Sequence, residues 1–323
     1  MARKLDARDR KLLYELDKNS RATFARLAHA AKMNKEVARY RVLGYLESEL
    51  VKPLLLVLLP PLGFLISRFF ITFQNVDEEK EREIVDYLMK KRGIIYVAST
   101  DGKYDLAFSV CVRDFLELSN LIEEFTDKFS EFIATRDMTF IVRSWFLPRT
   151  YLTADEREPV SVAISQPSGE IKKLDHNEVR ILKILGEDAR TPVVEIARKV
   201  GLSEDAVSAR IKKLEREKVI TQYSIVLDDN QISQRRYKVL INFHSITPDT
   251  EKSLYNYCNS HPKIVYVVKT IGAWDFEFDV ELTGELELRK ILGEIRVRFP
   301  ELIKSLSHVL VYKVRMFNPA ACL

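Results

Sequence analysis

The stretch that decides the fold is LDHNEVRILKILGEDARTPVVEIARKVGLSEDAVSARIKKLE, residues 174–215, because residues 5–46 repeat its pattern. The earlier copy reads LDARDRKLLYELDKNSRATFARLAHAAKMNKEVARYRVLGYL, and the two copies align without a gap at an offset of 169 residues. Each copy places apolar residues at helical spacing in three short runs. The chain is therefore a tandem repeat of one unit, and each unit begins with a helix-turn-helix pattern.

The third helix of each copy has a core side and an exposed side. We expect it to begin at Asn34 in the first copy and at Ser203 in the second, because both residues are good N-caps. The core positions follow the i, i+4, i+7 spacing, and they are Val207, Ile211 and Leu214 in the second copy and Ala38, Val42 and Tyr45 in the first. The opposite face then presents Lys35, Glu36, Arg39, Tyr40 and Leu43 in the first copy, and Glu204, Asp205, Ser208, Ala209 and Lys212 in the second.

After each set of three helices the hydrophobic period changes to a strand–helix–strand–strand–helix–strand order. In the first copy the elements are expected at 69–74, 78–92, 94–100, 105–112, 114–129 and 133–146, and in the second at 238–245, 249–260, 264–270, 275–282, 285–299 and 302–317. This order is the ferredoxin-like βαββαβ motif, which covers one sheet face with two helices and leaves the other face to pair with a second sheet. The predicted class is α+β.

Five segments follow from this order. They are a winged helix-turn-helix at 1–60, a sheet domain at 61–152, a linker at 153–170, a second winged helix-turn-helix at 171–232 and a second sheet domain at 233–323. The linker is predicted from its prolines, its glycine and a cluster of charges.

The positive charge is concentrated on the helix-turn-helix units. The net charge is +4 for the chain; residues 1–52 contribute +6, residues 170–224 contribute +2, and the remainder contributes −4. Phosphates would bind where the positive charge lies.

Several classes of site are not indicated. The three cysteines are odd in number and widely separated, which suggests a reducing compartment and neither a disulfide frame nor a zinc site. The five histidines are scattered, no glycine-rich phosphate loop follows a strand, and no signal peptide is recognised, so we expect a cytoplasmic protein without metal or cofactor.

One apolar stretch, residues 53–73, is long enough to span a membrane. Pro60, Pro61 and Arg68 argue against a span, because they would leave unpaired backbone groups and a charge in lipid. The alternative is a wing-like strand, a turn and the next strand. Six consecutive aliphatic residues, 54–59, would be a liability if exposed, so we expect another domain or subunit to bury them.

A helix-turn-helix followed by βαββαβ resembles the Lrp/AsnC, or feast/famine, family of transcription regulators, and this chain looks like two such proteins fused. The sheet domains carry the resemblance in a Gly-x-aromatic-Asp turn, which reads Gly102-Lys103-Tyr104-Asp105 and again Gly272-Ala273-Trp274-Asp275. The chain departs from the family after the third helix, where Glu49 and Lys218 stand in place of a usual glycine, so the helix end could differ.

The resemblance implies double-stranded DNA as partner, read mainly by the first copy. The candidate DNA-binding residues are Arg21, Asn34, Lys35, Arg39, Tyr40, Arg41, Arg190, Ser203, Ser208, Arg210 and Lys212. For the four arginines at 21, 41, 190 and 210, packing or capping is an equal alternative. Glu204 and Asp205 would repel phosphate, so the second copy is expected to bind more weakly or to bind something else.

The resemblance also places a small, amino-acid-like effector at the turns. The candidate residues are Gly102, Tyr104, Asp105, Gly272, Trp274 and Asp275, and a purely structural hairpin is the alternative. The two sheet domains are expected to pair either within one chain, as a pseudo-dimer, or in a homodimer.

Two other functions remain as alternatives to a DNA-reading regulator. One is a factor that docks on a protein of the transcription machinery. The other is an enzyme like the siroheme decarboxylases, which resemble this family and also occur as fusions. Those enzymes rely on histidine and arginine near the second sheet strand, whereas 96–100 and 266–270 here read YVAST and YVVKT.

Overall fold

The computed structural model describes residues 3–153, 162–166 and 171–323. The first repeat contains α1 (Ala7–Lys18), α2 (Phe24–Ala30), α3 (Lys35–Glu47), β1 (Val51–Val57), η1 (Pro60–Leu62), β2 (Leu65–Phe73), α4 (Glu78–Lys90), β3 (Ile94–Asp101), β4 (Leu106–Val112), α5 (Phe115–Phe129), η2 (Ser130–Phe132), β5 (Ile133–Phe146) and η3 (Thr150–Leu152). After β6 (Val162–Ser165), the second repeat contains α6 (His176–Glu187), α7 (Val193–Val200), α8 (Glu204–Arg216), β7 (Ile220–Leu227), η4 (Asp229–Ile232), β8 (Arg235–Phe243), α9 (Pro248–Ser260), β9 (Ile264–Gly272), β10 (Phe276–Leu282), α10 (Glu285–Arg298), β11 (Ile303–Phe317) and η5 (Pro319–Cys322). The predicted α+β class and the order of elements in both repeats are confirmed.

The two sheet domains close into one barrel. Within the described residues the large sheet has the order β2-β4-β3-β11-β8-β10-β9-β5-β6, and β2 also pairs with β5. The long strands β5 and β11 each pair with strands of both repeats, so they join the two βαββαβ units edge to edge. The sheet domains therefore pair within one chain, as a pseudo-dimer, which was one of the two arrangements expected.

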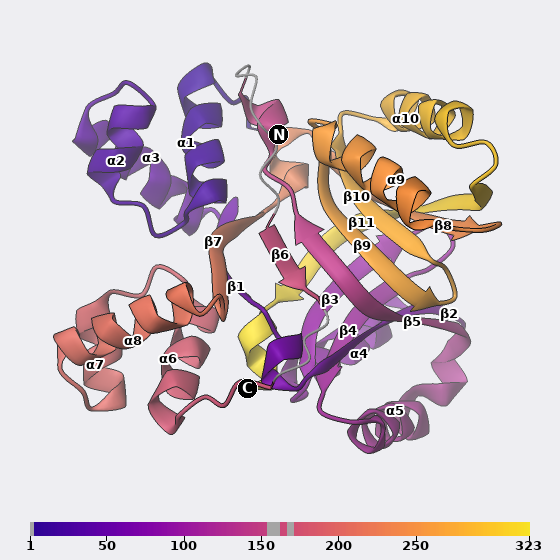
Figure 1. Cartoon of the computed structure of the whole chain (residues 1–323), viewed down its shortest axis with the longest axis horizontal. Coiled ribbons are helices and arrows are strands. Elements are labelled where there is room, and N and C mark those ends of the chain that lie inside the picture. Colours follow the sequence, from indigo (N-terminus) through magenta and orange to yellow (C-terminus); the bar gives the residue numbers. More distant parts are fainter. Residues whose placement is uncertain (1–2, 154–161, 167–170) are drawn as a thin grey trace.

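Strand alternation sorts the side chains between the barrel interior and the helices outside. On β10, Phe276, Phe278 and Val280 face a core that α9 and α10 cover, while the intervening residues face inward. On the first repeat α4 and α5 cover the equivalent core around Phe108 and Phe125. Figure 1 shows these two helix pairs on the outside of the sheet at the right, with the two helical units at the left.

A two-stranded antiparallel ribbon joins the two helical units, α1–α3 and α6–α8. β1 pairs antiparallel with β7, from Val51 opposite Leu227 to Val57 opposite Ile220. The end of β7 packs into the core of the first helical unit through Ile225 and Leu227. β1 packs into the core of the second helical unit, so each unit is completed by the other repeat's strand.

This exchange explains the apolar stretch 54–59. Its six residues are all buried, and all of them except Leu58 belong to one cluster with Ile181, Leu185 and Leu214 of the second helical unit. The expectation that another domain covers them is confirmed. The predicted segments 1–60 and 171–232 thus each contain a strand that packs on the helices of the other segment.

Two smaller expectations can be compared with the structure. The strand–turn–strand interpretation of residues 53–73 is confirmed, and no helix in the described ranges is long and apolar enough to cross a membrane. The linker prediction for 153–170 was incomplete, because β6 lies within it and pairs with β5. Residues 154–161 and 167–170 of that linker lie outside the described residues.

Candidate nucleic-acid interface

The exposed face of α3 is the main candidate surface. Ala38, Val42 and Tyr45 are fully buried, as the spacing predicted. Lys35, Arg39 and Tyr40 therefore project to solvent on the opposite side, and Tyr40 is 81% exposed. The ring of Tyr40 adds an exposed aromatic surface to this face. Three adjacent side chains on one helix face thus combine two cations with a free ring.

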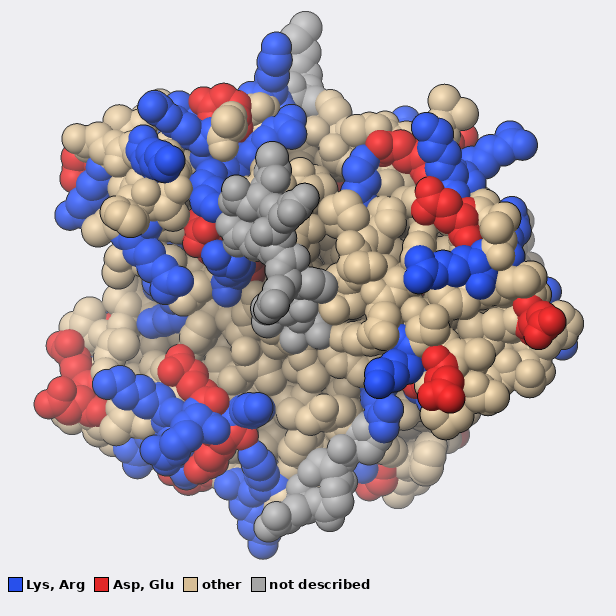
Figure 2. Space-filling model, turned by 45° about the horizontal axis from the view of Figure 1, so that its top comes forward, with Lys and Arg blue, Asp and Glu red and all other residues tan. Residues whose placement is uncertain are grey.

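The equivalent face of α8 carries negative charge in its first turn. Glu204 and Asp205 are exposed, Lys212 is exposed farther along, and Ser208 is half-buried between them. Figure 2 shows lysine and arginine gathered over both helical units at the left, with acidic side chains mixed among them at the lower unit. Helices α3 and α8 therefore present side chains of different charge to any common partner.

Asn34 and Ser203 serve the helices that they begin. The Asn34 side chain accepts a hydrogen bond from the amide of Glu36, at 2.8 Å, and Ser203 accepts one from the amide of Ala206, at 3.2 Å. Both are exposed, so their capping role leaves one side open to solvent.

Arg41 and its counterpart Arg210 have intramolecular partners. Arg41 donates to the carboxylates of Asp6 and Asp9, both at 2.8 Å. The backbone amide of Asp9 and the Arg41 guanidinium together hold the pKa of Asp6 below its usual range. Arg210 lies 3.7 Å from Asp175 and donates to the carbonyl of Ala206. These arginines tie the third helix to the start of the first.

Arg21 and Arg190 bind the two helical units to each other. Arg21 donates to the carbonyls of Ala189 and Thr191, in the turn before α7. Arg190 donates to the carbonyls of Ser20 and Ala22, in the turn before α2. All four arginines thus have the packing or capping role, and a role in binding DNA phosphates stays a prediction.

Helices α3 and α8 end in the left-handed conformation that glycine favours. Glu49 has φ +54° and Lys218 has φ +55°. A non-glycine residue there costs roughly 1 kcal/mol or more. The departure from the usual glycine at these two positions therefore appears in the structure as backbone strain.

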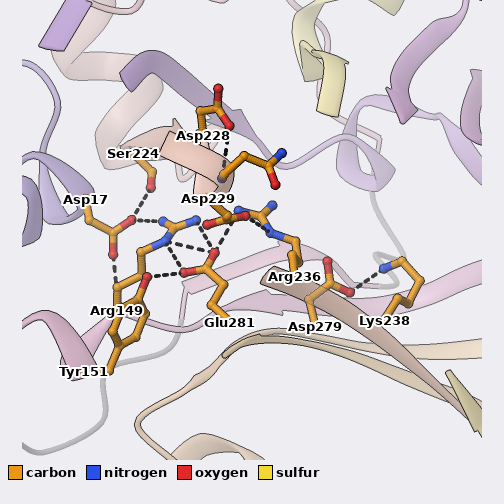
Figure 3. A network of polar contacts seen from close by, with 11 residues as sticks. Asp17, Arg149, Tyr151, Ser224, Asp228, Asp229, Arg236, Lys238, Asp279 and Glu281 are labelled. Carbon is orange, nitrogen blue, oxygen red and sulfur yellow. Dashed lines mark hydrogen bonds and ion pairs between the residues drawn. The ribbon is translucent and has the colours of Figure 1, made fainter. Parts of the chain in front are cut away.

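A buried ion network, defined as Asp17, Arg149, Tyr151, Asp229, Arg236 and Glu281, joins the first helical unit to the barrel (Figure 3). Arg149 follows β5 and is 1% exposed; its guanidinium binds Asp17 of α1 and Glu281 of β10. Tyr151 also donates to Glu281, at 2.5 Å, and Arg236 donates to the same carboxylate at 2.7 Å. Burial alone would raise the pKa of Glu281, but Arg149 and Arg236 hold it below its usual range.

The barrel interior continues this network. Glu277 binds Arg68, and Asp279 binds Lys238, all four being buried. A cavity of about 30 Å³ lies among Arg68, Tyr96, Lys238, Tyr266 and neighbouring side chains, which is room for water and not for a larger ligand.

Sequence reasoning did not find this interior. A signal was present, because charged residues occupy every second position of 277–281 and of 236–238, and such alternation on a strand places all of them on one face.

The Gly-x-aromatic-Asp turns are built as hairpins. The carboxylates of Asp105 and Asp275 accept hydrogen bonds from the amides of Phe73 and Phe243, at 2.6 Å and 2.8 Å. A Cβ atom on Gly272 would lie 2.4 Å from the carbonyl oxygen of Met138, so this position admits only glycine.

The aromatic residues of the turns point inward, where Tyr104 and Trp274 pack around Phe70 in the barrel. Gly102 and Gly272 are exposed on the surface. An effector at these six residues stays a prediction. In the part of the chain that the structure describes, no group of three or more His, Cys, Asp or Glu residues is placed to hold a metal ion.

Comparison with known proteins identifies the second helical unit and relatives the size of one repeat. The profile of the AsnC-type helix-turn-helix domain matches residues 174–215. The transcriptional regulator LysM of Saccharolobus solfataricus is 30% identical over 125 residues, which is 84% of that protein and 38% of this chain. The proline dehydrogenase transcriptional activator of Rhodobacter capsulatus is 29% identical over 148 residues, which is 89% of that protein and 42% of this chain. Each relative is thus the size of about one repeat.

A solved structure matches the whole chain. The siroheme decarboxylase NirDL superposes with a TM-score of 0.58 at 13% identity, covering 97% of this chain and 93% of that one. At this identity the likeness shows the fold alone, including the arrangement of two repeats in one molecule.

Proposed function

Because the chain belongs to the Lrp/AsnC family of transcription regulators, we propose that it binds double-stranded DNA in a sequence-dependent manner through α3, with α8 as an unequal second reader. The observation that carries the proposal is the face of α3, where Lys35, Arg39 and Tyr40 are exposed above a fully buried core. A helix of this kind in the major groove uses cations for phosphates and base edges.

The arrangement of the helical units supports this proposal. The reciprocal hydrogen bonds of Arg21 and Arg190 keep the two units in one relative position. Two readers with a set separation select operators whose half-sites have a matching spacing. Asn34, Ser203, Ser208 and Lys212 complete the proposed contacts. The arginines at 21, 41, 190 and 210 position the helices, and contacts from them to phosphates are also part of the proposal.

The test is a salt series of binding to duplex fragments selected from random sequence. The variant Lys35→Ala/Arg39→Ala is expected to weaken binding and to lower the slope of log affinity against log salt by about 1 for each phosphate that the variant no longer binds. The matched control is Arg289→Ala/Lys290→Ala, which removes two exposed cations from α10 on the far side of the molecule (Figure 1). An equal loss of affinity in both variants would mean that α3 has no special role.

An amino-acid-like effector is the finer part of the proposal. The exposed turns around Gly102 and Gly272 support it, because an exposed glycine lets a ligand approach the backbone closely. Calorimetry with each standard amino acid, with and without bound DNA, tests it. An effector must bind one of the two forms more tightly, so equal dissociation constants for both forms would exclude regulation by that amino acid.

A protein partner is the second candidate, and the carboxylates of α8 favour it. Glu204 and Asp205 are exposed where a DNA reader would present neutral or basic groups. The variant Glu204→Lys/Asp205→Lys should strengthen DNA binding if α8 faces phosphate. If it instead abolishes regulation while Lys35→Ala/Arg39→Ala leaves regulation intact, the protein acts by docking.

The siroheme decarboxylase likeness favours a third candidate, an enzyme, but the barrel interior does not add support for it. The cavity there is about 30 Å³, and the buried cations that line it already have carboxylate partners. One neighbour was solved with an iron-uroporphyrin III analogue. Absorbance titration with that analogue tests the enzyme directly, and a saturable spectral shift would overturn our proposal.

A further inference from the structure

Two cysteines far apart in sequence meet inside the molecule. The sulfur atoms of Cys111, on β4, and Cys322, in η5, are 2.9 Å apart, and both residues are free thiols. A disulfide requires about 2.05 Å, so the sulfurs need to approach by only about 0.9 Å. The third cysteine, Cys258, belongs to α9 and faces the core between the sheet and helices α9 and α10.

The repeat shows that this contact is one of two equivalent joints. In the first joint, η3 packs on α1, and Glu281 of β10 binds Arg149 beside it. In the second joint, η5 packs on α6 and contacts β3. Cys111 occupies on β4 the place that Glu281 occupies on β10, because each is the residue before the last of its strand. Ion pairs hold the first joint, and two thiols stand at the second.

The second joint is also closely packed. A Cβ atom on Gly186 of α6 would lie 2.6 Å from both Ala320 and Asn318. Any change in the position of η5 is therefore transmitted to α6, because no space separates them. Asn318 is in turn held to the barrel by a hydrogen bond from its amide to the carbonyl of Ile95, at 2.8 Å.

A surface pocket leads to the thiols. It has a volume of about 260 Å³ and is lined by both cysteines and by Lys91, Arg92 and Arg113. The charged residues that also line it are Glu117 and Glu124. Lys91 already binds Glu124, so Arg92 and Arg113 are the cations left to attract a small disulfide that carries carboxylates, such as oxidised glutathione.

We propose that Cys111 and Cys322 are a redox pair, which a low-molecular-weight disulfide oxidises to an intramolecular disulfide that fixes η5, and with it the second helical unit, on the barrel. One cysteine, as thiolate, attacks a sulfur of the reagent and releases one thiol. The other cysteine, as thiolate, then attacks the mixed disulfide and releases the second thiol. Two electrons pass from the cysteines to the reagent, and the two protons end on the released thiols.

Burial and the neighbouring Cys322 raise the pKa of Cys111. Because the thiolate is the reacting form, oxidation is slow at neutral pH and faster as the pH rises. Arg113 opposes this effect and Glu117 reinforces it.

The test uses the full chain equilibrated in glutathione buffers of increasing oxidation. Intact mass and non-reducing peptide maps are expected to show the loss of two hydrogens, no glutathione adduct and a link between Cys111 and Cys322. The variant Cys258→Ser should behave identically, whereas Cys322→Ser should retain the Cys111 thiol or carry one glutathione. A link to Cys258, or three free thiols at every buffer composition, would overturn the proposal.

A second measurement needs no variant. Closing so long a loop should raise the thermal midpoint of the oxidised chain by several degrees over the reduced chain. Equal midpoints would show that the bond does not constrain η5. A change in DNA binding on oxidation would rest on the proposed function, but the expected mass and thermal midpoint do not. If neither form binds DNA while the link forms, the proposed function fails and the redox pair stands.

Discussion

Arg21 and Arg190 make the same pair of hydrogen bonds in opposite directions. Arg21 binds the carbonyls on either side of Arg190, those of Ala189 and Thr191, and Arg190 binds the carbonyls on either side of Arg21, those of Ser20 and Ala22. A two-fold relation between the repeats produces this reciprocity. The two helical units therefore meet at the turns that precede α2 and α7.

Replacing either arginine should loosen this contact. We expect Arg21→Ala or Arg190→Ala to lower the free energy of unfolding by about 2 kcal/mol, because charged donors make strong hydrogen bonds. The double variant should lose less than the sum, since the two side chains share one interface. Chemical denaturation measures both, and Arg26→Ala, an exposed arginine of α2, is the control.

The buried ion network should be far more sensitive. Arg149→Met leaves the carboxylates of Asp17 and Glu281 buried without their common cation, and we expect a loss of about 3–5 kcal/mol. Arg143→Met, at an exposed position of the same strand β5, should change stability by less than about 0.5 kcal/mol. Similar losses in both variants would show that the ion pairs of Arg149 add no more to the free energy of unfolding than an exposed arginine does.

The two halves of the DNA site should be unequal. Since α3 presents cations and α8 begins with two carboxylates, we expect selected operators to show one strong and one weak half-site. Footprinting of Lys35→Ala/Arg39→Ala should lose protection over the strong half first. A palindromic motif with equal protection would contradict this expectation.

The strained helix ends offer stabilising substitutions. Glu49→Gly and Lys218→Gly should each raise the free energy of unfolding by about 0.5–1 kcal/mol, because glycine accepts positive φ without a steric cost. The control is Glu47→Gly, which puts glycine in the last turn of α3 and should cost about 1 kcal/mol. Thermal unfolding of the three variants gives the signs directly.

The pH dependence of the free energy of unfolding should reveal the contribution of the Glu287 carboxylate. Its carboxylate binds Lys263 and the amide of Thr283, and these contacts lower its pKa to about 2. A lowered folded-state pKa stabilises the protein above the unfolded value and loses this effect as the pH falls. Glu287→Gln should therefore cost about 1 kcal/mol at neutral pH, given its partial exposure, and progressively less between pH 4.5 and pH 2. A difference that stays constant down to pH 2 would exclude this origin.

Much of the fold could be predicted because its signals are local. Capping residues such as Asn34 and Ser203, the spacing of Val207, Ile211 and Leu214, and the change of period after each helical unit are all visible along the chain. The burial of residues 54–59 also followed from their composition, since six exposed aliphatic residues would be costly.

The candidate site could be predicted only in part. The exposed face of α3 follows from helix geometry, but the partners of Arg21 and Arg190 lie about one repeat away in sequence. Nothing local distinguishes an arginine that will bind a phosphate from one that will bind a distant carbonyl.

The sequence by itself determined the two repeats, their elements and the faces of their helices, because hydrophobic period and caps act within a few residues of each other. Only the tertiary structure decided the exchange of β1 and β7, the closure of the barrel, the charged interior around Glu281 and the meeting of Cys111 with Cys322. The contacts between the two repeats join residues more than a hundred positions apart, and their free energy depends on burial that exists only after the repeats have packed together.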